Sequence, residues 1–332
     1  MKTLGKIAVL GGGSWATALA KLIADNGTPF VWYMRRQDRI DDFLKYGHNP
    51  VYLSDASFDT GLIDFRVDIN EACSIADSLI VAFPSPYLKW HTDRISVDIS
   101  GKNIISAVKG IVPDDNMIVT DYFARRFGCD ERNMLVIGGP CHAEEVALGR
   151  LSYLTIGGKD SDKAARFASL IAGDKMRTIL SDDIDGIEYG AVLKKNVYAI
   201  AAGIISGMKS GDNFMAMMVS NAIREMRHFI DAVAPMQREI CDSAYLGDLL
   251  VTAYSKFSRN HNFGSMIGKG YSVQVAMMEM SQVAEGYYGT KCIHEICSRC
   301  NVEMPIADCV YAILYENENP QEAFRRITGT FS

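Results

Sequence analysis

The first half of the chain alternates short apolar runs with stretches in which apolar residues recur every three or four positions. The runs show little polar alternation, which is typical of strands covered on both faces. We therefore predict strands at residues 7–10, 30–33, 78–83, 103–108 and 134–137. Helical spacing is clearest at residues 14–25 and 38–46. Strands that alternate with helices indicate a parallel sheet with helices on both faces.

The pattern changes after about Asp185. Strand-like runs end there, and long helical patterns follow at residues 189–208, 215–234, 273–280 and 289–300. A chain of 332 residues is long enough for two domains. We expect an α/β domain over residues 1–186 and an all-helical domain over residues 187–332.

The composition is that of a globular protein, with 48% hydrophobic and 22% charged residues. The formal net charge of −6 argues against nucleic acid and anionic membranes as partners, because both attract basic surfaces. No apolar run approaches the roughly 18 residues of a spanning helix, so we expect no membrane insertion. The first residues also do not follow the pattern of a signal peptide. We therefore expect a cytoplasmic protein whose eight cysteines are reduced thiols.

A zinc site is the alternative interpretation of the cysteines near the end of the sequence. Cys297 and Cys300 have the spacing of a ligand pair, and Cys292, His294 and Cys309 lie close to them in the sequence. A second pair with suitable spacing is missing. We therefore favour buried thiols on helices and expect no metal.

A glycine-rich turn follows the first predicted strand and opens the first predicted helix. Gly11, Gly13 and Ala16 fit the pattern G-x-G-x-x-G/A. The first glycine permits a tight turn, the second lets the backbone approach a pyrophosphate, and a small third residue lets the helix pack on the strand. The helix N-terminus then offers N–H groups to the phosphates. The position of the motif predicts a dinucleotide-binding site.

The end of the second predicted strand indicates which dinucleotide is bound. Enzymes that use NAD usually place a carboxylate there for the ribose hydroxyls, whereas this chain has Arg35 and Arg36. Two guanidinium groups suit a 2′-phosphate. We expect NADPH to be preferred, with NADH as the other cofactor, and the alternative is a solvated pair of loop arginines.

Four further segments stand out. They are Ala107–Ile111, Gly138–Val146, Leu193–Gly203, and Leu246–Leu249 with Thr252 and Ser258–Asn260. With the glycine turn, their order and spacing resemble the NAD(P)-dependent glycerol-3-phosphate dehydrogenases of the bacterial biosynthetic type. The likeness runs from about Lys6 to about Glu285.

The resemblance implies a Rossmann-type N-terminal domain, an all-helical C-terminal domain and a site in the cleft between them. It also implies reversible hydride transfer between dihydroxyacetone phosphate, a small phosphorylated triose, and sn-glycerol 3-phosphate. In this family the reaction runs toward glycerol 3-phosphate for phospholipid synthesis, and homodimers are common.

The resemblance carries individual roles onto this sequence, with Lys195 as the catalytic lysine. The implied substrate-binding residues are Lys109, Gly139, Cys141, Lys195, Asp248, Ser258, Arg259 and Asn260. The implied cofactor-binding residues are Gly11, Gly13, Ser14, Trp15, Arg35, Arg36, Lys109, Ala143, Arg259, Val283 and Glu285.

Ketone reduction explains why a lysine is needed. Hydride transfer leaves negative charge on the oxygen, and an ammonium group beside it stabilises that charge and donates the proton. Lys109 and Lys195 could lower each other's proton affinity, and Asp248 could orient Lys195 or bind a substrate hydroxyl. The family pattern places lysine directly before asparagine, which selects Lys195, and Lys194 is expected to point elsewhere.

Three positions depart from the family pattern. Cys141 stands where serine or threonine is frequent, and a thiol is a poorer hydrogen-bond donor. His142 replaces a common aromatic residue, and Tyr245 replaces a smaller one.

Two other functions stay open from the sequence. One is a dehydrogenase with the same domain plan that acts on a hydroxy acid or sugar acid. The other is a non-catalytic sensor that binds NADPH and signals through a partner. A substrate panel separates the first from the family activity, and NADPH binding without turnover identifies the second.

Overall fold

The computed structural model describes residues 4–113, 115–255, 258–280 and 284–331. Contacts divide the chain into two compact units. The first unit runs to Val108 and continues over Val119–Ile184. The second unit consists of Lys109–Ile118 and of the chain from Asp185 onward. The segment Lys109–Ile118, an excursion of the chain between two parts of the first unit, therefore belongs to the second unit.

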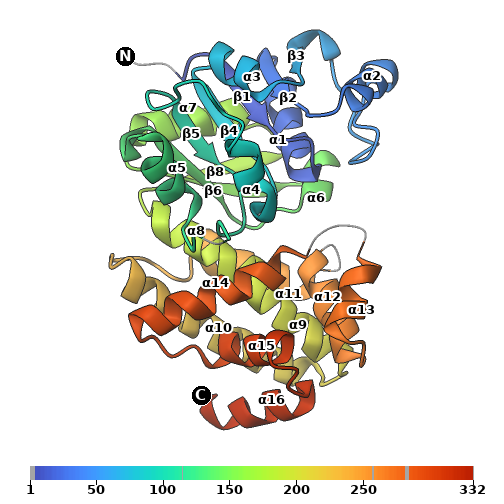
Figure 1. Cartoon of the computed structure of the whole chain (residues 1–332), viewed down its shortest axis with the longest axis vertical. Coiled ribbons are helices and arrows are strands. Elements are labelled where there is room, and N and C mark those ends of the chain that lie inside the picture. The colour runs from blue at the N-terminus through green and yellow to red at the C-terminus, as the bar shows by residue number, and fades with distance from the viewer. Residues whose placement is uncertain (1–3, 114, 256–257, 281–283, 332) are drawn as a thin grey trace. The chain divides into compact units, whose positions relative to one another are not determined.

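The first unit is built on one sheet, which has eight strands within the described residues (Figure 1). Its order is β3-β2-β1-β4-β5-β6-β7-β8. The strands are β1 (Ile7–Leu10), β2 (Phe30–Tyr33), β3 (Ile63–Arg66), β4 (Ser78–Val81), β5 (Asn103–Ser106), β6 (Met134–Gly138), β7 (Ser152–Gly158) and β8 (Met176–Ser181). Because β1 lies between β2 and β4, the strand order reverses there, and such a switch point is where open α/β sheets bind ligands.

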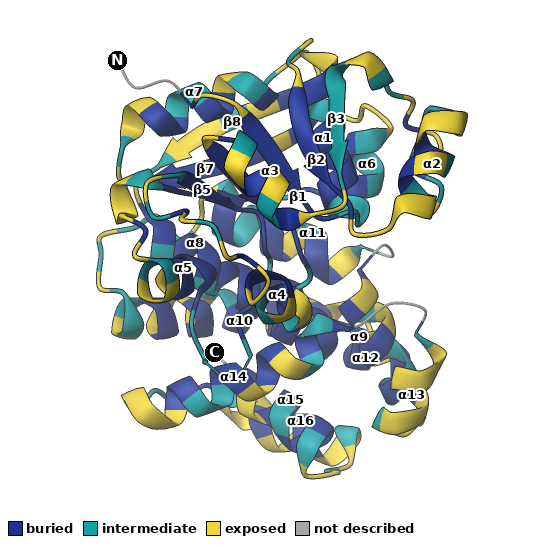
Figure 2. Cartoon of the chain, turned by 45° about the horizontal axis from the view of Figure 1, so that its top comes forward, coloured by how far each residue is buried: buried dark blue, intermediate teal, exposed yellow. Residues whose placement is uncertain are grey.

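The five predicted strands are confirmed as β1, β2, β4, β5 and β6, with β4 and β5 ending two residues earlier than expected. All are buried, and the central strands are dark blue in Figure 2, whereas β3 is only partly covered. The apolar runs are buried strands, but β7, which is buried except at Tyr153, was missed because serine, threonine and glycine interrupt its apolar residues.

The sheet is mostly parallel, as expected, and the five predicted strands pair in parallel, whereas β7 runs antiparallel to β6. A parallel return needs a crossover, usually a helix that runs back along the sheet. Here the connection contains α6 (Ala143–Ala147), a helix of only five residues. At 1.5 Å per residue it is about 7.5 Å long, roughly half the length of β6. The chain therefore reverses direction.

The first unit has six further helices within the described residues. They are α1 (Ser14–Asp25), α2 (Gln37–Tyr46), α3 (Ile69–Ile75), α4 (Ser85–Thr92), α5 (Val119–Phe127) and α7 (Ser161–Ile171). The helix α1 matches its predicted bounds, and its face of alanine, leucine and isoleucine is buried. Short 3₁₀ turns lie at Thr60–Leu62 and Glu131–Asn133.

From Asp185 onward, every regular element of the second unit within the described residues is helical, as expected (Figure 1). Its α-helices are α8 (from Ile184 to Val192), α9 (Tyr198–Gly207), α10 (Asp212–Val233), α11 (Asp248–Tyr254), α12 (Arg259–Gly268), α13 (Val273–Glu279), α14 (Glu285–Cys300), α15 (Pro305–Tyr315) and α16 (Pro320–Ile327). Two π-helical turns precede α9 and α11, at Leu193–Val197 and Ser243–Gly247. A 3₁₀ turn at Thr328–Thr330 follows α16. The segment Lys109–Ile118 holds an isolated β-bridge between Val112 and Met117.

Glycines allow α9 and α12 to pack backbone against backbone. A Cβ at Gly203 would overlap the carbonyl oxygen of His261, and one at Gly264 would overlap that of Ile200. Gly207 and Gly268 are equally tight against the facing helix. This close packing fixes the start of α12 against the turn that precedes α9.

A buried carboxyl group caps α15 from another helix. Glu225 of α10 accepts hydrogen bonds from the backbone N–H groups of Ile306 (2.7 Å) and Ala307 (3.1 Å), and from the Tyr198 hydroxyl (3.2 Å). Burial raises the pKa of Glu225 to about 8. The carboxyl group therefore holds a proton at neutral pH.

Most cysteines of α14 and α15 are buried thiols of the protein interior. Cys292, Cys297 and Cys309 are buried, and burial raises the pKa of Cys297 and Cys309 to about 12. In the described ranges, no group of three or more histidine, cysteine or acidic side chains is arranged to hold a metal ion.

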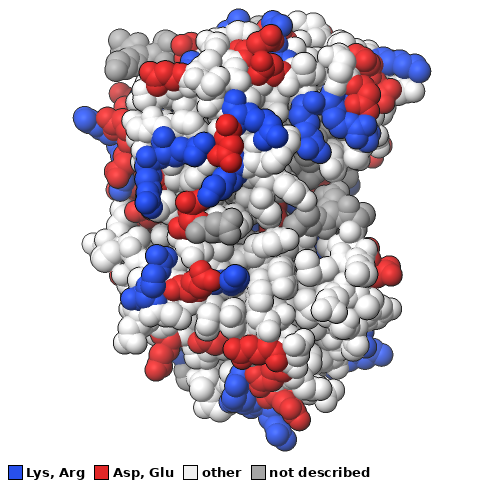
Figure 3. All heavy atoms as spheres, in the orientation of Figure 1, with Lys and Arg blue, Asp and Glu red and all other residues white. Residues whose placement is uncertain are grey.

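No described helix combines the length and apolar character needed to cross a bilayer. On the face shown in Figure 3, both units carry acidic and basic side chains.

Candidate functional site

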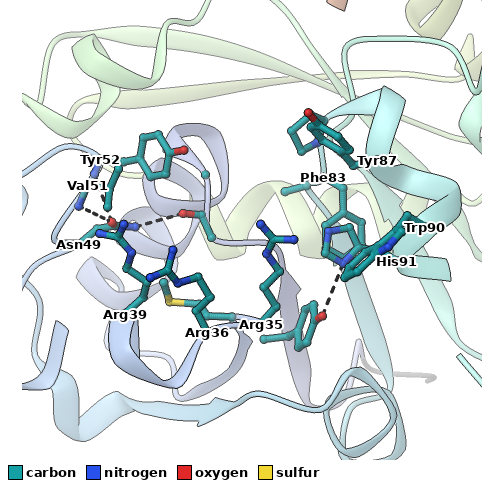
Figure 4. A pocket seen from close by; sticks show the side chains of 17 residues that line it. Arg35, Arg36, Arg39, Asn49, Val51, Tyr52, Phe83, Tyr87, Trp90 and His91 are labelled. Atoms are coloured by element: carbon teal, nitrogen blue, oxygen red, sulfur yellow. Dashed lines mark hydrogen bonds between the residues drawn. The ribbon is translucent and has the colours of Figure 1, made fainter. Parts of the chain in front are cut away.

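A cavity of about 510 Å³ opens in the first unit at the switch point of the sheet. Figure 4 shows it from close by. It is bounded by the glycine turn (Gly11–Gly13), the residues that follow β2 (Met34–Arg36), Arg39 of α2, segment 49–52, and the end of β4 with α4. We call this cavity the arginine pocket.

The glycine turn has the geometry that its sequence requires. Gly11 has a φ of +128°, and a Cβ there would lie 2.8 Å from the Ala82 carbonyl oxygen. The Trp32 indole donates a hydrogen bond to the Gly11 carbonyl oxygen (2.7 Å) and so anchors the turn to β2. A Cβ at Gly13 would meet no described atom within 4 Å, and no described side chain caps α1. An open space before an uncapped helix N-terminus fits a phosphate group.

Three arginines face this space. Arg35 and Arg36 lie where the sequence predicts them, and the Arg35 guanidinium is 5.6 Å from the centre of the Trp90 ring. Arg36 donates a hydrogen bond to Asp38 (2.9 Å). Arg39 was not predicted, and Figure 4 shows it beside Arg36. Arg39 lies in the first turn of α2, three residues after the N-cap residue Arg36, and residues three apart at this spacing are neighbours on a helix surface.

Asn49 is a second residue that the sequence analysis missed. Its side chain is 1% exposed and donates to Thr17 Oγ1 (2.8 Å) and to the Gly12 carbonyl oxygen (3.3 Å). Its Oδ1 accepts from the backbone N–H groups of Val51 (3.0 Å) and Tyr52 (3.1 Å). Asn49 thus ties one wall of the arginine pocket to the glycine turn. Nothing local in the sequence indicates these long-range partners.

The opposite wall is aromatic. The rings of Phe83 and His91 stack with centroids 4.0 Å apart, and the Tyr33 hydroxyl lies 3.5 Å from His91 Nδ1. Burial, reinforced by Arg35 and Arg94, lowers the pKa of His91 to about 4. The imidazole is therefore neutral at physiological pH and adds no charge to the pocket.

The second unit holds a buried group of two lysines and one aspartate, the lysine–aspartate cluster. Lys195 Nζ pairs with Asp248 Oδ1, and Lys194 Nζ lies 3.4 Å from Asp248 Oδ2. The side chains of Lys194, Lys195 and Asp248 are 0%, 9% and 2% exposed. Lys195 and Asp248, which lie far apart in the sequence, are brought together as the resemblance implies.

The expectation that Lys194 points elsewhere is wrong. Successive residues of an α-helix diverge by about 100° around its axis. Lys194 and Lys195 instead lie in the π-helical turn Leu193–Val197, where hydrogen bonds span an extra residue. Both ammonium groups therefore reach one carboxylate. Burial lowers the pKa of Lys194 to about 8, although Asp248 opposes this effect.

Two asparagines join the cluster to other predicted residues. Asn260 donates to the Lys195 carbonyl oxygen (2.7 Å) and to Asn196 Oδ1 (2.8 Å). Asn196 in turn donates to the Lys109 carbonyl oxygen (2.9 Å). The Gly286 N–H donates to Asn260 Oδ1 (3.0 Å). Lys109, Lys195 and Asn260 are therefore held in one hydrogen-bonded network.

Other predicted residues lie at the start of helices in the second unit. Ser258 caps α12 by accepting from the His261 N–H (3.2 Å). Arg259 is partly exposed, and its Nη2 lies 3.8 Å from Glu285 Oε1. Val283 falls outside the residues that the structure describes.

The remaining predicted residues lie in the first unit. Ser14 and Trp15 begin α1, and Ala143 begins α6 after His142. Gly139 has a φ of +107°, and a Cβ there would lie 2.9 Å from the Tyr153 carbonyl oxygen. The Cys141 thiol donates to that same oxygen (3.1 Å). At this position the thiol holds the turn against β7.

Comparison with known families gives two matches that together span most of the chain. Residues 6–164 match the family model of the NAD-dependent glycerol-3-phosphate dehydrogenase N-terminus. Residues 183–325 match the model of the NAD-dependent glycerol-3-phosphate dehydrogenase C-terminus.

Individual relatives agree over nearly their whole lengths. The glycerol-3-phosphate dehydrogenase [NAD(P)+] of Staphylococcus carnosus is 30% identical over 328 residues, covering 98% of each chain. That of Listeria monocytogenes is 32% identical, covering 98% of this chain and 97% of the relative. The crystal structure of glycerol-3-phosphate dehydrogenase from Coxiella burnetii superposes with a TM-score of 0.88 at 27% identity, covering 98% of each chain.

Proposed function

The chain belongs to the NAD-dependent glycerol-3-phosphate dehydrogenase family, and from that premise we propose that it reduces dihydroxyacetone phosphate to sn-glycerol 3-phosphate, reversibly, with NADPH or NADH. The observation that carries the proposal is the buried Lys195–Asp248 pair. An ammonium group held by a carboxylate, away from water, is suited to stabilise and protonate an oxyanion.

In this proposal Lys195 is the proton donor. When bound, the reduced nicotinamide supplies a hydride to the carbonyl carbon. The Lys195 ammonium lies beside the carbonyl oxygen, stabilises its growing negative charge and transfers one proton to it, which completes the alcohol. Asp248 fixes the direction of the ammonium group. In the reverse direction the neutral amine of Lys195 accepts the hydroxyl proton.

The substrate phosphate is assigned to the start of α12. The Arg259 guanidinium and the Ser258 hydroxyl supply charge and hydrogen bonds for it. Asn260 donates both amide hydrogens to Lys195 and Asn196, and its Oδ1 accepts from the Gly286 N–H. A substrate contact would therefore be made by Oδ1 accepting from a substrate hydroxyl, not by binding the phosphate oxygens. Lys109, Gly139 and Cys141 complete the proposed substrate set.

The arginine pocket is assigned to the dinucleotide, with the pyrophosphate at Gly13, Ser14 and Trp15. Arg35 and Arg36, joined by Arg39, would hold a 2′-phosphate, which supports a preference for NADPH. Lys109, Ala143, Arg259, Val283 and Glu285 are proposed as further cofactor contacts. Equal kcat/KM values for NADPH and NADH, or a higher value for NADH, would refute the preference.

From the sequence pattern we also propose a dinucleotide-binding domain over residues 1–186, a substrate-binding domain over residues 187–332 and a cytoplasmic location. A homodimer and a role in phospholipid synthesis are proposed from the family resemblance.

The deciding experiment follows NADPH oxidation by the purified protein with dihydroxyacetone phosphate. Unphosphorylated dihydroxyacetone is the control, because it has the same ketone without the charge that Arg259 would bind. Phosphate-dependent oxidation is the expected result. Absence of oxidation while NADPH still binds would contradict the proposal and favour a hydroxy acid substrate or a sensor.

A further inference from the structure

Lys194 is a buried cation that the proposed reaction does not use. Its side chain is fully buried, whereas lysines are almost never fully buried unless they are paired. Its partner Asp248 is shared with Lys195, so two ammonium groups draw on one carboxylate. Such an arrangement is costly, because burying a charge without full compensation destabilises the fold.

The surroundings of Lys194 are built to hold its amine in place. A Cβ at Gly190 would lie 3.5 Å from Lys194 Nζ and 3.3 Å from the Tyr245 ring. The amine therefore occupies a space between the α8 backbone and the π-helical turn Ser243–Gly247. The titratable groups that the structure places about this amine are Asp248, Lys195 and Tyr245.

Resting on the proposed function, we propose that Lys194 is a positioning residue that acts through Asp248 and controls how tightly Lys195 holds its proton. Each lysine binds a different oxygen of the same carboxylate. While Lys194 is charged, it neutralises part of the negative charge of Asp248 and repels the Lys195 ammonium. Lys195 therefore releases its proton more readily. Burial lowers the pKa of Lys194 to about 8, so this lysine still carries its charge at neutral pH.

Replacing Lys194 with methionine removes this charge at nearly constant side-chain shape. The Asp248 carboxylate then pairs with Lys195 alone, and Lys195 stays protonated up to a higher pH. Oxidation of glycerol 3-phosphate needs the neutral amine, so the acidic limb of its kcat/KM profile should move upward by about one pH unit. On that limb the rate at a fixed pH falls about tenfold.

The experiment measures this profile for wild type, Lys194→Met, Lys194→Gln and Lys194→Arg, with thermal unfolding and NADPH binding as checks of folding. Lys163→Met is the matched control, because Lys163 is a buried lysine of the first unit that binds Arg132 and Asn133. We expect both neutral variants to shift the limb, and Lys194→Arg and Lys163→Met to leave it in place.

The outcomes separate this inference from the proposed function. A wild-type protein that does not turn over dihydroxyacetone phosphate overturns both. An active wild type with an unshifted limb in a folded neutral variant overturns only the role of Lys194. If the neutral variants fold without activity, activity in Lys194→Arg supports a charge requirement, and its absence refutes it. Failure of both neutral variants to fold also refutes the proposal and leaves Lys194 a structural role.

Discussion

Both the side chain and the backbone of Lys195 are held in place. Asp248 pairs with its ammonium group, and Asn260 binds its backbone carbonyl oxygen. The π-helical turn fixes the direction in which the side chain leaves the helix. A proton donor needs this degree of fixation, because small displacements from the reacting atom cost rate.

Replacing Lys195 with alanine should reduce kcat by about two to four orders of magnitude. Binding of NADPH should survive, because the arginine pocket consists of first-unit residues. Steady-state kinetics and NADPH fluorescence titration measure the two effects, with Lys163→Ala as the control. Retained turnover would assign the proton transfer to Lys194 or to neither lysine.

Replacing Arg39 with serine should weaken NADPH binding about tenfold or more, since a hydrogen bond to a charged group is worth roughly 1.5–3 kcal/mol. Binding of NADH, which has no 2′-phosphate, should change little. Titration with both dinucleotides distinguishes a specific from a general effect. Arg299 is exposed on α14, and Arg299→Ser is the control for loss of a positive charge. Equal weakening of both dinucleotides would show that Arg39 does not select the phosphate.

The site could be predicted from sequence where one residue type at a fixed spacing carries the chemistry. Gly11 and Gly13 belong to this class, as do Lys195 and Asp248 through the family pattern. Asn49 could not be predicted, because its role depends on partners distant in the sequence. Lys194 was misjudged because α-helical geometry was assumed where the chain forms a π-helical turn.

At the scale of elements, α9 and α12 act as one part. Their glycines remove side chains from the contact, so the two backbones approach without a layer between them. Asn260 lies on α12, and its side chain donates hydrogen bonds to Lys195 and Asn196 in the π-helical turn before α9. The packing of two helices thus determines the position of the proposed proton donor.

Replacing Gly264 with alanine should lower the free energy of unfolding by about 1–3 kcal/mol, as overpacking does, because its Cβ would overlap the Ile200 carbonyl oxygen. It should also lower kcat more than NADPH affinity, since Asn260 lies on the same helix. Denaturant unfolding and kinetics test both effects. Gly101→Ala is the control, because a Cβ there meets no described atom within 4 Å. Equal stability of the two variants would argue against the close helix contact.

Replacing Glu225 with glutamine should change how stability depends on pH. The pKa of Glu225 is about 8 in the folded protein and near the ordinary 4.5 once unfolded, so the folded state binds more protons between these values. Its contribution is full below about pH 4.5 and is lost as the pH rises toward 8. The Tm of wild type relative to Glu225→Gln should therefore fall by several degrees over this range. A constant Tm difference would mean that the carboxyl group does not stay protonated.

The fold could be predicted where hydrophobic pattern and burial coincide. The five apolar runs became the fully covered strands, and the long helical patterns became helices of the second unit. The strand β3, with Asp64 and Arg66, alternates charged and apolar residues at the edge of the sheet. The strand β8 is also an edge strand that is half exposed. A search for continuous apolar runs does not find such strands.

At the scale of the whole molecule, the chain passes from one unit to the other three times, after Val108, Ile118 and Ile184. The excursion Lys109–Ile118 is attached to the second unit by its own contacts. Asn196 binds the Lys109 carbonyl oxygen, and Asn116 donates to Glu295. A fragment that ends at Ile184 would therefore carry a segment without its partners.

This connectivity gives the protein an order of assembly during synthesis. All residues of the arginine pocket lie before residue 92, whereas Asn196, Asp248 and Glu295 leave the ribosome much later. At roughly 5–20 residues per second, the segment Lys109–Ile118 waits on the order of ten seconds for Glu295. The nascent chain therefore contains every residue of the arginine pocket before those of the lysine–aspartate cluster, and a dinucleotide bound there, as proposed, would stabilise the first unit during that interval.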